Sequence, residues 1–213
     1  MAETAKRDGA GTKAATGERS KERYERRLTQ VVDTAASVFA ARGYHATTID
    51  HLVEATGLQR GGLYHYIGGK LDLLIAIHER FIEPLLEDAR AITARDEAPD
   101  VQLRALAHAL MGDITGYRDQ VTVFLHEWRA LEADPAWKGI KRSRREFEDI
   151  VTGVLVRGRD EGRFRFNDER LTLMAFLGIF NYSYQWYDAK KDATPDQIAD
   201  EFTDIFISGI QVT

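Results

Sequence analysis

Apolar residues recur every three or four positions along much of the chain, a spacing that buries one face of an α-helix. The stretch from about Glu22 to Arg42 shows it first, and Gly43 directly after it suits a left-handed C-terminal cap. Alternating apolar and polar positions, typical of half-buried strands, are nearly absent. The pattern therefore predicts an all-α fold. The first helix is marked by Leu28, Val31, Val32, Ala35, Val38 and Phe39.

Two short helices joined at a glycine are predicted next. Either Thr47 or Thr48 is a suitable N-cap for the first of them, and Gly57 interrupts its helical pattern. The second short helix is expected to begin near Gln59 and to run to about Tyr66. Two short helices with a glycine between them indicate a helix-turn-helix.

Longer helices are predicted in the rest of the chain. The pair Gly68-Gly69 breaks the pattern again, and a long helix is expected from about Lys70 towards Ala91, with Pro84 inside it. Polar stretches and prolines divide the remaining residues into further helical segments. These are expected at about 100–115, 118–133, 136–161, 168–188 and 195–211.

Composition narrows the class of protein. The 213 residues include no cysteine, which excludes a disulfide scaffold, a thiolate zinc site and a cysteine nucleophile. Residues 1–20 are polar, so we expect them to be disordered and not to act as a secretion signal. No run approaches the ~20 apolar residues of a membrane helix, which predicts a cytoplasmic protein without a membrane partner.

Charge is distributed unevenly along the chain. Residues 1–70 hold 11 basic and 8 acidic side chains, a net charge of 11 − 8 = +3. The other residues hold 18 and 26, a net charge of 18 − 26 = −8. A basic first third on an acidic remainder is expected if the first part meets phosphate, although a basic leader can also arise by chance.

The second short helix has the chemistry of a helix that enters the major groove of DNA. The guanidinium of Arg60 can make a bidentate contact to a guanine or bind a phosphate. Gly61 and Gly62 cost helix stability, roughly 1 kcal/mol each against alanine, and allow the backbone to approach DNA closely. Tyr64 and Tyr66 carry hydroxyls that can donate to phosphate.

Residues 43–74 resemble the DNA-binding signature of TetR-family transcriptional regulators. The resemblance rests on "GYHATTIDHLVEATGL", then "RGGLYHYIGGK", then a leucine-rich helix. Two positions depart from the family pattern. Gly62 stands where serine or threonine is commoner, which is expected to remove a phosphate contact. Ile67 stands where phenylalanine is usual, a tolerable core substitution.

The resemblance implies a helix-turn-helix head at residues 21–70, a disordered basic leader at 1–20, and an effector-binding and dimerisation body at 71–213. In the head, Tyr64 and Leu63 can alternatively serve largely as core, and Lys70 would clamp a phosphate. The residues expected to face DNA are Thr47, Thr48, Gln59, Arg60, Gly61, Gly62, Tyr64, His65, Tyr66 and Lys70.

The basic residues before and within the first helix have two interpretations. They can reach phosphates or the adjacent minor groove, or form a solvated leader without contacts. They are Lys6, Arg7, Lys13, Arg19, Lys21, Arg23, Arg26 and Arg27.

The family resemblance also implies a homodimer, because two-fold dimers read pseudo-palindromic operators and one small head buries little DNA surface. The dimer interface is expected on the last two long helices, at 168–188 and 195–210. A hydrophobic effector pocket is expected between the body helices, although aromatic residues at helical spacing also form ordinary core. The candidate lining residues are Met111, Tyr117, Phe124, Trp128, Phe147, Val151, Leu155, Met174, Phe176, Phe180, Tyr182 and Trp186.

A second resemblance concerns residues 117–202, which are similar to TetR regulators of fatty-acid, phenylacetate or steroid-ring degradation that respond to acyl-CoA thioesters. The "EGRF" turn, Trp186-Tyr187 before a polar loop, and "TPDQI" carry it. Those relatives tend to have Arg-Pro after the aromatic pair, where this chain has Asp188-Ala189. Arginines could bind the CoA phosphates, or pair with Glu146, Glu148 and Asp149 on a solvated helix face. The candidates are Arg118, Arg129, Arg142, Arg144 and Arg145.

Other functions fit less well. A multidrug-type repressor that senses lipophilic drugs or cations is the main alternative. An enzyme or a simple helical ligand carrier is a distant one, because no nucleophile elbow, phosphate-binding glycine loop or His-Glu-x-x-His motif is present. We expect no cofactor and no metal site.

Overall fold

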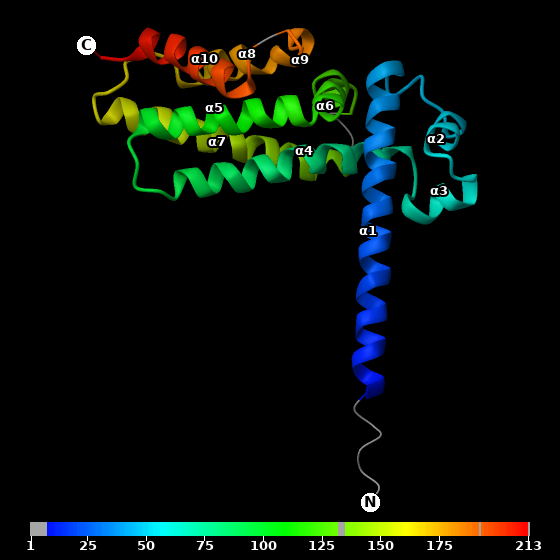
Figure 1. The fold of residues 1–213 in the computed structure, drawn as a ribbon. Coiled ribbons are helices and arrows are strands. Elements are labelled where there is room, and N and C mark those ends of the chain that lie inside the picture. Colours follow the sequence, from blue (N-terminus) through cyan, green and yellow to red (C-terminus); the bar gives the residue numbers. More distant parts are fainter. Residues whose placement is uncertain (1–7, 132–134, 192, 213) are drawn as a thin grey trace, which may run out of the picture. The chain divides into compact units, whose positions relative to one another are not determined.

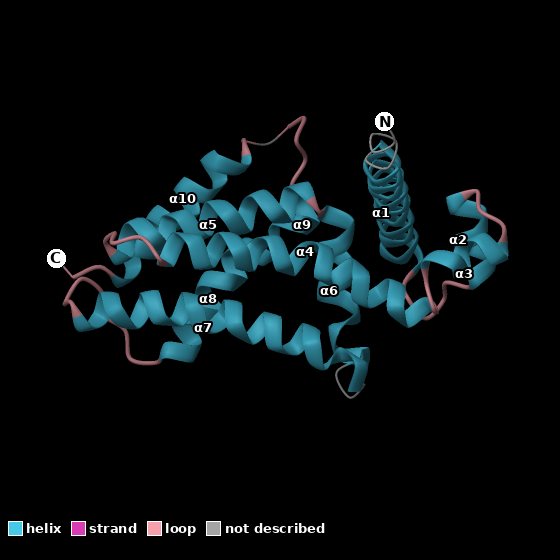
Figure 2. Ribbon diagram, turned by 90° about the horizontal axis from the view of Figure 1, so that it is seen from below, coloured by secondary structure: helices cyan, strands magenta, loops and turns pink. Residues whose placement is uncertain are grey.

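The computed structural model describes residues 8–131, 135–191 and 193–212, with side chains from Gly17 onwards except those of residues 128–131. These residues are helical apart from loops and an isolated β-bridge between Phe164 and Gln211, so the all-α prediction is confirmed (Figures 1 and 2). The helices are α1 (Asp8–Arg42), α2 (Ile49–Thr56), α3 (Arg60–Tyr66), α4 (Lys70–Thr93), α5 (Pro99–Gly116), α6 (Arg118–Leu131), the 3₁₀ helix η1 (Pro135–Trp137), α7 (Lys138–Asp160), α8 (Glu169–Asn181), α9 (Ser183–Trp186) and α10 (Pro195–Ile210).

The chain forms two compact units, Met1–Leu74 and Ile75–Thr213. In the first unit, α1, α2 and α3 enclose a small apolar core. Gly43 and Gly57 have φ values of 80° and 66°, so both predicted helix ends are left-handed turns that favour glycine. The buried core residues include Val31, Val32, Ala35, Phe39, Leu52, Leu63 and Ile67.

The first helix is longer than its apolar pattern predicted. It begins at Asp8, whereas the apolar spacing starts near Glu22 and residues 1–20 were expected to be disordered. Apolar periodicity detects the part of a helix that packs on a core, and among the described side chains of α1 the first buried apolar residue is Val31. The first half of α1 is rich in alanine, lysine, arginine and glutamate, which favour helix without any burial.

The second unit packs the remaining helices around α5. Both α7 and α10 lie against α5, and the aromatic core includes Phe176 and Phe180 of α8. The predicted helix at 168–188 is wrong as a single element, because α8 ends at Asn181 and the short α9 follows Tyr182. Asparagine and serine at this junction compete for backbone hydrogen bonds and weaken a continuous helix. Among the described residues, no helix is both long and apolar enough to cross a bilayer.

Candidate nucleic-acid interface and effector pocket

Leu63 is the one residue of α3 that is fully buried in the core of the head. Arg60, Tyr64 and His65, by contrast, are exposed. Tyr64 exposes 46% of its surface, so Leu63 serves as core and Tyr64 does not. The helix therefore presents most of its polar side chains to solvent, together with Gln59, which precedes its first turn.

Glycine is not required by the fold at the start of α3. A Cβ built on Gly61 meets nothing within 4 Å, and one on Gly62 meets only Leu58 at 3.9 Å, an ordinary contact. Neither glycine has a positive φ. Alanine would fit at both positions and would favour the helix. The folded head therefore does not explain why glycine occupies them.

Arg60 is paired with an acidic residue of the preceding helix. One terminal nitrogen of its guanidinium lies 2.6 Å from Oδ1 of Asp50, and both side chains are exposed. Exposed pairs of this kind contribute little to stability. The pair directs the guanidinium of Arg60 towards α2, and its other N–H groups remain as donors for a further partner.

The two candidate threonines before α2 have different surroundings. Thr48 caps α2: its hydroxyl accepts from the backbone N–H of His51, whose ring Nδ1 accepts from the Thr48 N–H. Thr47 is 1% exposed, and its hydroxyl donates to the carbonyl of Gly43 at 2.8 Å. The structure therefore places Thr48 at the surface and Thr47 inside the loop.

Lys70 is engaged with the loop that precedes α2. Its ammonium donates to the carbonyl oxygens of Tyr44 at 2.7 Å and Thr47 at 2.9 Å, and lies 4.3 Å from the centre of the Tyr44 ring. An ammonium has three donors, so one remains for a phosphate. These contacts fasten the first turn of α4 to the end of α1, a role that the sequence did not reveal.

An aromatic cluster supports the last turn of α3. The ring of Tyr24, from α1, stacks on Tyr66 with centroids 5.1 Å apart and meets the edge of His65 at 5.7 Å. Tyr66 is half-buried by this packing, whereas His65 stays exposed. The prediction brought Tyr66 and His65 to one surface but missed Tyr24, which lies within the predicted first helix and before Leu28, the first of its listed apolar residues.

A small apolar cavity of about 50 Å³ lies in the body among α4, α5, α6, α7 and α8. Phe124 and Phe147, both predicted, line it. At its rim the guanidinium of Arg144 pairs with Glu148 at 2.9 Å and lies over the Phe124 ring. The cavity residues that the prediction missed are Phe81, Ile82, Leu85, Leu110, Leu125, Glu148, Leu177 and Asn181.

The other predicted pocket residues lie elsewhere. Tyr117 is half-buried beneath Arg80, whereas Tyr182 and Trp186 are 66% and 40% exposed and Met174 is 37% exposed. The side chain of Trp128 lies outside the described residues. The predicted residues buried in the core without lining the cavity are Met111, Val151, Leu155, Phe176 and Phe180.

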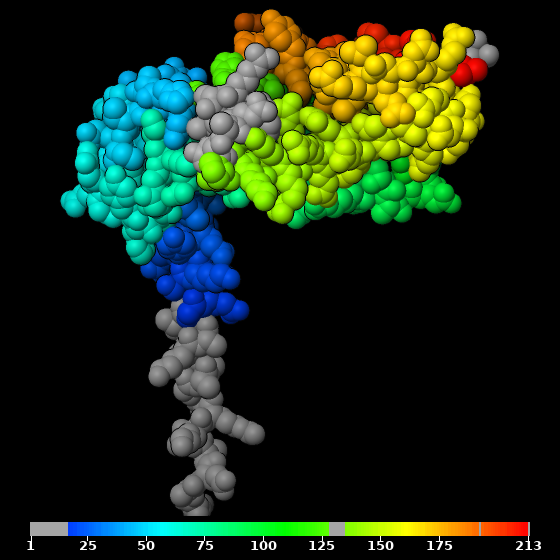
Figure 3. Space-filling view, turned by 180° about the vertical axis from the view of Figure 1, so that it is seen from behind, coloured from blue at the N-terminus to red at the C-terminus, as the bar shows by residue number. Residues whose placement is uncertain are grey.

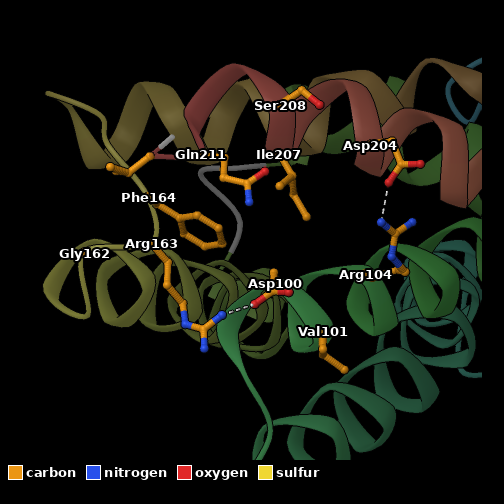
Figure 4. A pocket seen from close by; sticks show the side chains of 11 residues that line it. Asp100, Val101, Arg104, Gly162, Arg163, Phe164, Asp204, Ile207, Ser208 and Gln211 are labelled. Carbon is orange, nitrogen blue, oxygen red and sulfur yellow. Dashed lines mark hydrogen bonds and ion pairs between the residues drawn. The ribbon is translucent and has the colours of Figure 1, made fainter.

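A second, polar cavity of about 470 Å³ lies between the start of α5, the turn after α7 and the end of α10 (Figure 4). Arg163 pairs with Asp100 at 3.0 Å, and Arg104 pairs with Asp204. Each arginine that lines this cavity is paired with an aspartate that also lines it. The cavity is therefore polar and does not resemble a site for an acyl chain.

Ion pairs continue along the contact between α5 and α10. Asp200 accepts from Arg104 at 3.1 Å and lies 2.9 Å from the ring of His108, which also reaches Asp196 at 3.1 Å. Burial opposes the charged imidazole, but the hydrogen bonds to Asp200 and Asp196 outweigh it and raise the pKa of His108. These contacts join α10 to α5.

A carboxylate lies against the apolar interior of the body. Asp113 on α5 is half-buried, and its Oδ2 has no hydrogen-bond partner among the described residues. Burial, with a contribution from the charge of Asp88, raises the pKa of Asp113 to about 7. This carboxyl therefore titrates near neutral pH.

Large apolar side chains are exposed along α8 and α10. Leu171, Met174 and Tyr182 follow a helical spacing at and beyond α8, with exposed fractions of 63%, 37% and 66%. Ile205 on α10 is 59% exposed. Exposed apolar side chains gathered on neighbouring elements are typical of an interaction surface.

Comparison with known proteins accords with this architecture. Residues 31–77 match the family model described as "Bacterial regulatory proteins, tetR family", and residues 96–210 match "Tetracyclin repressor-like, C-terminal domain". The HTH-type transcriptional repressor KstR2 of Rhodococcus jostii is 28% identical over 185 residues, which cover 86% of this chain and 91% of that protein.

Solved structures show the same fold. The ketosteroid transcriptional regulator KstR2 of Mycobacterium tuberculosis superimposes with a TM-score of 0.82 at 26% identity, covering 88% of this chain and 96% of that one. AibR, solved in complex with isovaleryl coenzyme A and operator DNA, superimposes with a TM-score of 0.75 at 25% identity, covering 84% and 97%. The second family model alone spans more than half of the chain, and the first accounts for the helix-turn-helix. The chain therefore belongs to the TetR family of transcriptional regulators.

Proposed function

We propose that this regulator is a dimeric repressor of pseudo-palindromic operator DNA, released by an acyl-CoA thioester. The observation that carries DNA binding is the exposed α3, whose glycines leave bare backbone where the fold has no need of it. Arg60, Gln59 and His65 would read or contact the duplex from this helix, with Tyr64 and Thr48 on its phosphates.

The effector proposal rests on the body. Its apolar cavity has aromatic walls that suit an acyl group, and Arg144 at the rim would bind a CoA phosphate by exchanging its present partner Glu148 for it. AibR was solved with isovaleryl coenzyme A, and KstR2 is named a ketosteroid regulator, both at comparable similarity to this chain. A lipophilic drug or cation is the alternative, because an apolar cavity alone does not select between them.

The size of the cavity suggests how an effector acts. Drug-sized ligands occupy roughly 300–1,000 Å³, so a cavity of about 50 Å³ must widen to accept an acyl chain. Phe81, Ile82 and Leu85 of α4 form part of its wall. The same helix begins at Lys70, which is fastened to the loop before α2. Widening would therefore displace a helix that continues into the DNA-binding head.

A homodimer completes the proposal. The exposed apolar side chains of α8 and α10, among them Leu171 and Ile205, would meet their copies across a two-fold axis. We assign residues 21–70 to DNA binding and 71–213 to effector binding and dimerisation, preceded by a basic leader.

Footprinting on duplex DNA from upstream of the protein's own gene tests DNA recognition. The wild type should protect one pseudo-palindromic site in the presence of excess competitor DNA, and Arg60→Ala should protect none at the same concentration while remaining a folded dimer. Protection of the same site by both proteins would contradict the assignment of α3 as the recognition helix.

A further inference from the structure

The described side chains at the start of α1, from Gly17 to Arg26, have no part in the buried core of the head. Figures 1 and 3 show α1 continuing well beyond α2 and α3, and every residue from Gly17 to Arg26 is exposed. The apolar contacts of this helix begin only near Val31 and Val32, which are almost fully buried. Packing therefore does not explain why the helix extends so far.

Three arginines on this part of α1 lie on one side of the helix. Arg19, Arg23 and Arg27 follow one another at intervals of four residues and form one row. Glu18 and Glu22 form a second row beside it, in which Glu22 lies three residues from Arg19, and Glu25 is paired with Lys21 at 3.7 Å.

The arginine row places like charges next to one another on the helix. Like charges four residues apart destabilise a helix by roughly 0.2–0.5 kcal/mol per pair, and both rows contain such pairs. Within the part of the chain whose side chains are described, no carboxylate pairs with Arg19, Arg23 or Arg26. An anion along the arginine row would reduce the repulsion within that row.

The arginine row is held next to the recognition helix. Tyr24 lies within the same segment and stacks on Tyr66 of α3, with an edge contact to His65. Arg27 donates to the carbonyl of Thr56, the last residue of α2, at 3.4 Å. With a rise of 1.5 Å per residue, Arg19 lies only ~7.5 Å along the axis from Tyr24.

We propose that this arginine row, defined by Arg19, Arg23 and Arg27, binds the phosphate backbone of duplex DNA beside the groove that α3 enters. The row spans about 12 Å, over which one DNA strand carries about three or four phosphates. The guanidinium fork matches phosphate oxygens in a bidentate manner, and the proximity of α3 places DNA on this side. The inference rests on the proposed recognition of DNA by α3 and adds a second, sequence-independent contact.

The salt dependence of DNA binding tests this surface. Each phosphate contact contributes about 0.9 to the slope of log K against log salt, so the double variant Arg19→Gln/Arg23→Gln should lower the slope by about 2. The matched control Glu18→Gln/Glu22→Gln alters the acidic row of the same turns and should keep the wild-type slope. Glutamine favours helix as well as arginine does, so circular dichroism should show unchanged helicity in both variants.

The same titration on a long duplex and on one trimmed to the region that the arginine double variant still protects locates the contact. The arginine variant should lose affinity on the long duplex and little on the trimmed one. An unchanged slope for the arginine variant, or equal losses in both double variants, would overturn the proposal. If the wild type does not distinguish operator from scrambled DNA, the proposed recognition fails, but a lower slope of the arginine variant on scrambled DNA would still support the row. If the wild type binds no duplex, both proposals fail.

Discussion

The ammonium of Lys70 lies 2.7 Å from the carbonyl oxygen of Tyr44 and 4.3 Å from the centre of the Tyr44 ring. This contact joins the first residue of α4 to the loop after α1. It gives Lys70 a role in the folded head that does not depend on DNA.

Replacing Lys70 by methionine should therefore destabilise the protein without DNA present. Hydrogen bonds from a charged group contribute about 1.5–3 kcal/mol, and two are lost. Thermal unfolding followed by circular dichroism should show a lower Tm for Lys70→Met, with Lys21→Met, at an exposed site on α1, as the control. Equal Tm values for Lys70→Met and the wild type would mean that Lys70 does not stabilise the head and acts only in DNA binding.

Arg60→Ala should weaken operator binding by about 1–3 kcal/mol, which is ~5–150-fold, because a forked contact to base or phosphate is lost. The free energy of unfolding should change by less than ~1 kcal/mol, because the Asp50–Arg60 pair is exposed. Anisotropy with labelled operator and urea unfolding measure the two quantities. Loss of stability without loss of operator affinity would show that Arg60 stabilises the head and does not contact DNA.

Gly61→Ala separates folding from recognition. The added methyl group meets nothing within 4 Å in the head, and alanine favours the helix by up to ~1 kcal/mol. We expect stability to hold or rise while operator affinity falls, since the methyl would stand where DNA approaches the backbone. If affinity is unchanged, DNA does not approach α3 at Gly61.

The carboxyl of Asp113 should make stability depend on pH. Its folded pKa is raised to about 7 by burial and by Asp88, above the value near 4 expected in the unfolded chain. The folded state then holds the proton more tightly, so this group lowers the free energy of unfolding as the pH rises from about 4 to 7.

Asp113→Asn removes that titration and should be more stable than the wild type at pH 8, with the difference shrinking as the pH approaches 5. Urea unfolding at several pH values measures it. A difference that does not vary with pH would show that the carboxyl does not titrate in this range.

Ile205→Glu and Leu171→Glu should dissociate the dimer, because each places a charge in an apolar interface. Val101→Glu, at a similarly exposed apolar position on α5, is the matched control and should stay dimeric. Sedimentation velocity separates the two states. A dimer that persists in both α8 and α10 variants would place the interface on another face.

The helices of the head could be predicted because their ends are set by residues close in sequence. Thr48 caps α2 through hydrogen bonds to a residue three positions on, and the left-handed φ of Gly57 ends that helix. Both depend on neighbours in the chain, so the boundaries of α2 and α3 were predicted well. The division of the chain into a DNA-binding head and an effector-binding body was predicted from the family resemblance.

Features that depend on distant contacts were not predictable. Lys70 reaches carbonyls more than twenty positions earlier, and the contacts of Tyr24 with α3 span about forty. Of the predicted pocket residues, only Phe124 and Phe147 line the cavity in the body. Helical spacing predicts that an aromatic residue is buried, but it does not distinguish a residue that lines a cavity from one that packs in the core. Which aromatic residue faces a void depends on the packing of five helices.

In the proposed mechanism, an acyl-CoA and operator DNA compete through the conformation of one protein. The decisive measurement is fluorescence anisotropy of the labelled operator complex, titrated with acyl-CoAs of several chain lengths and ring types at near-physiological salt. We expect one class of thioester to release the DNA while free coenzyme A does not. A complex unaffected by every thioester, yet released by lipophilic cations, would contradict the acyl-CoA assignment.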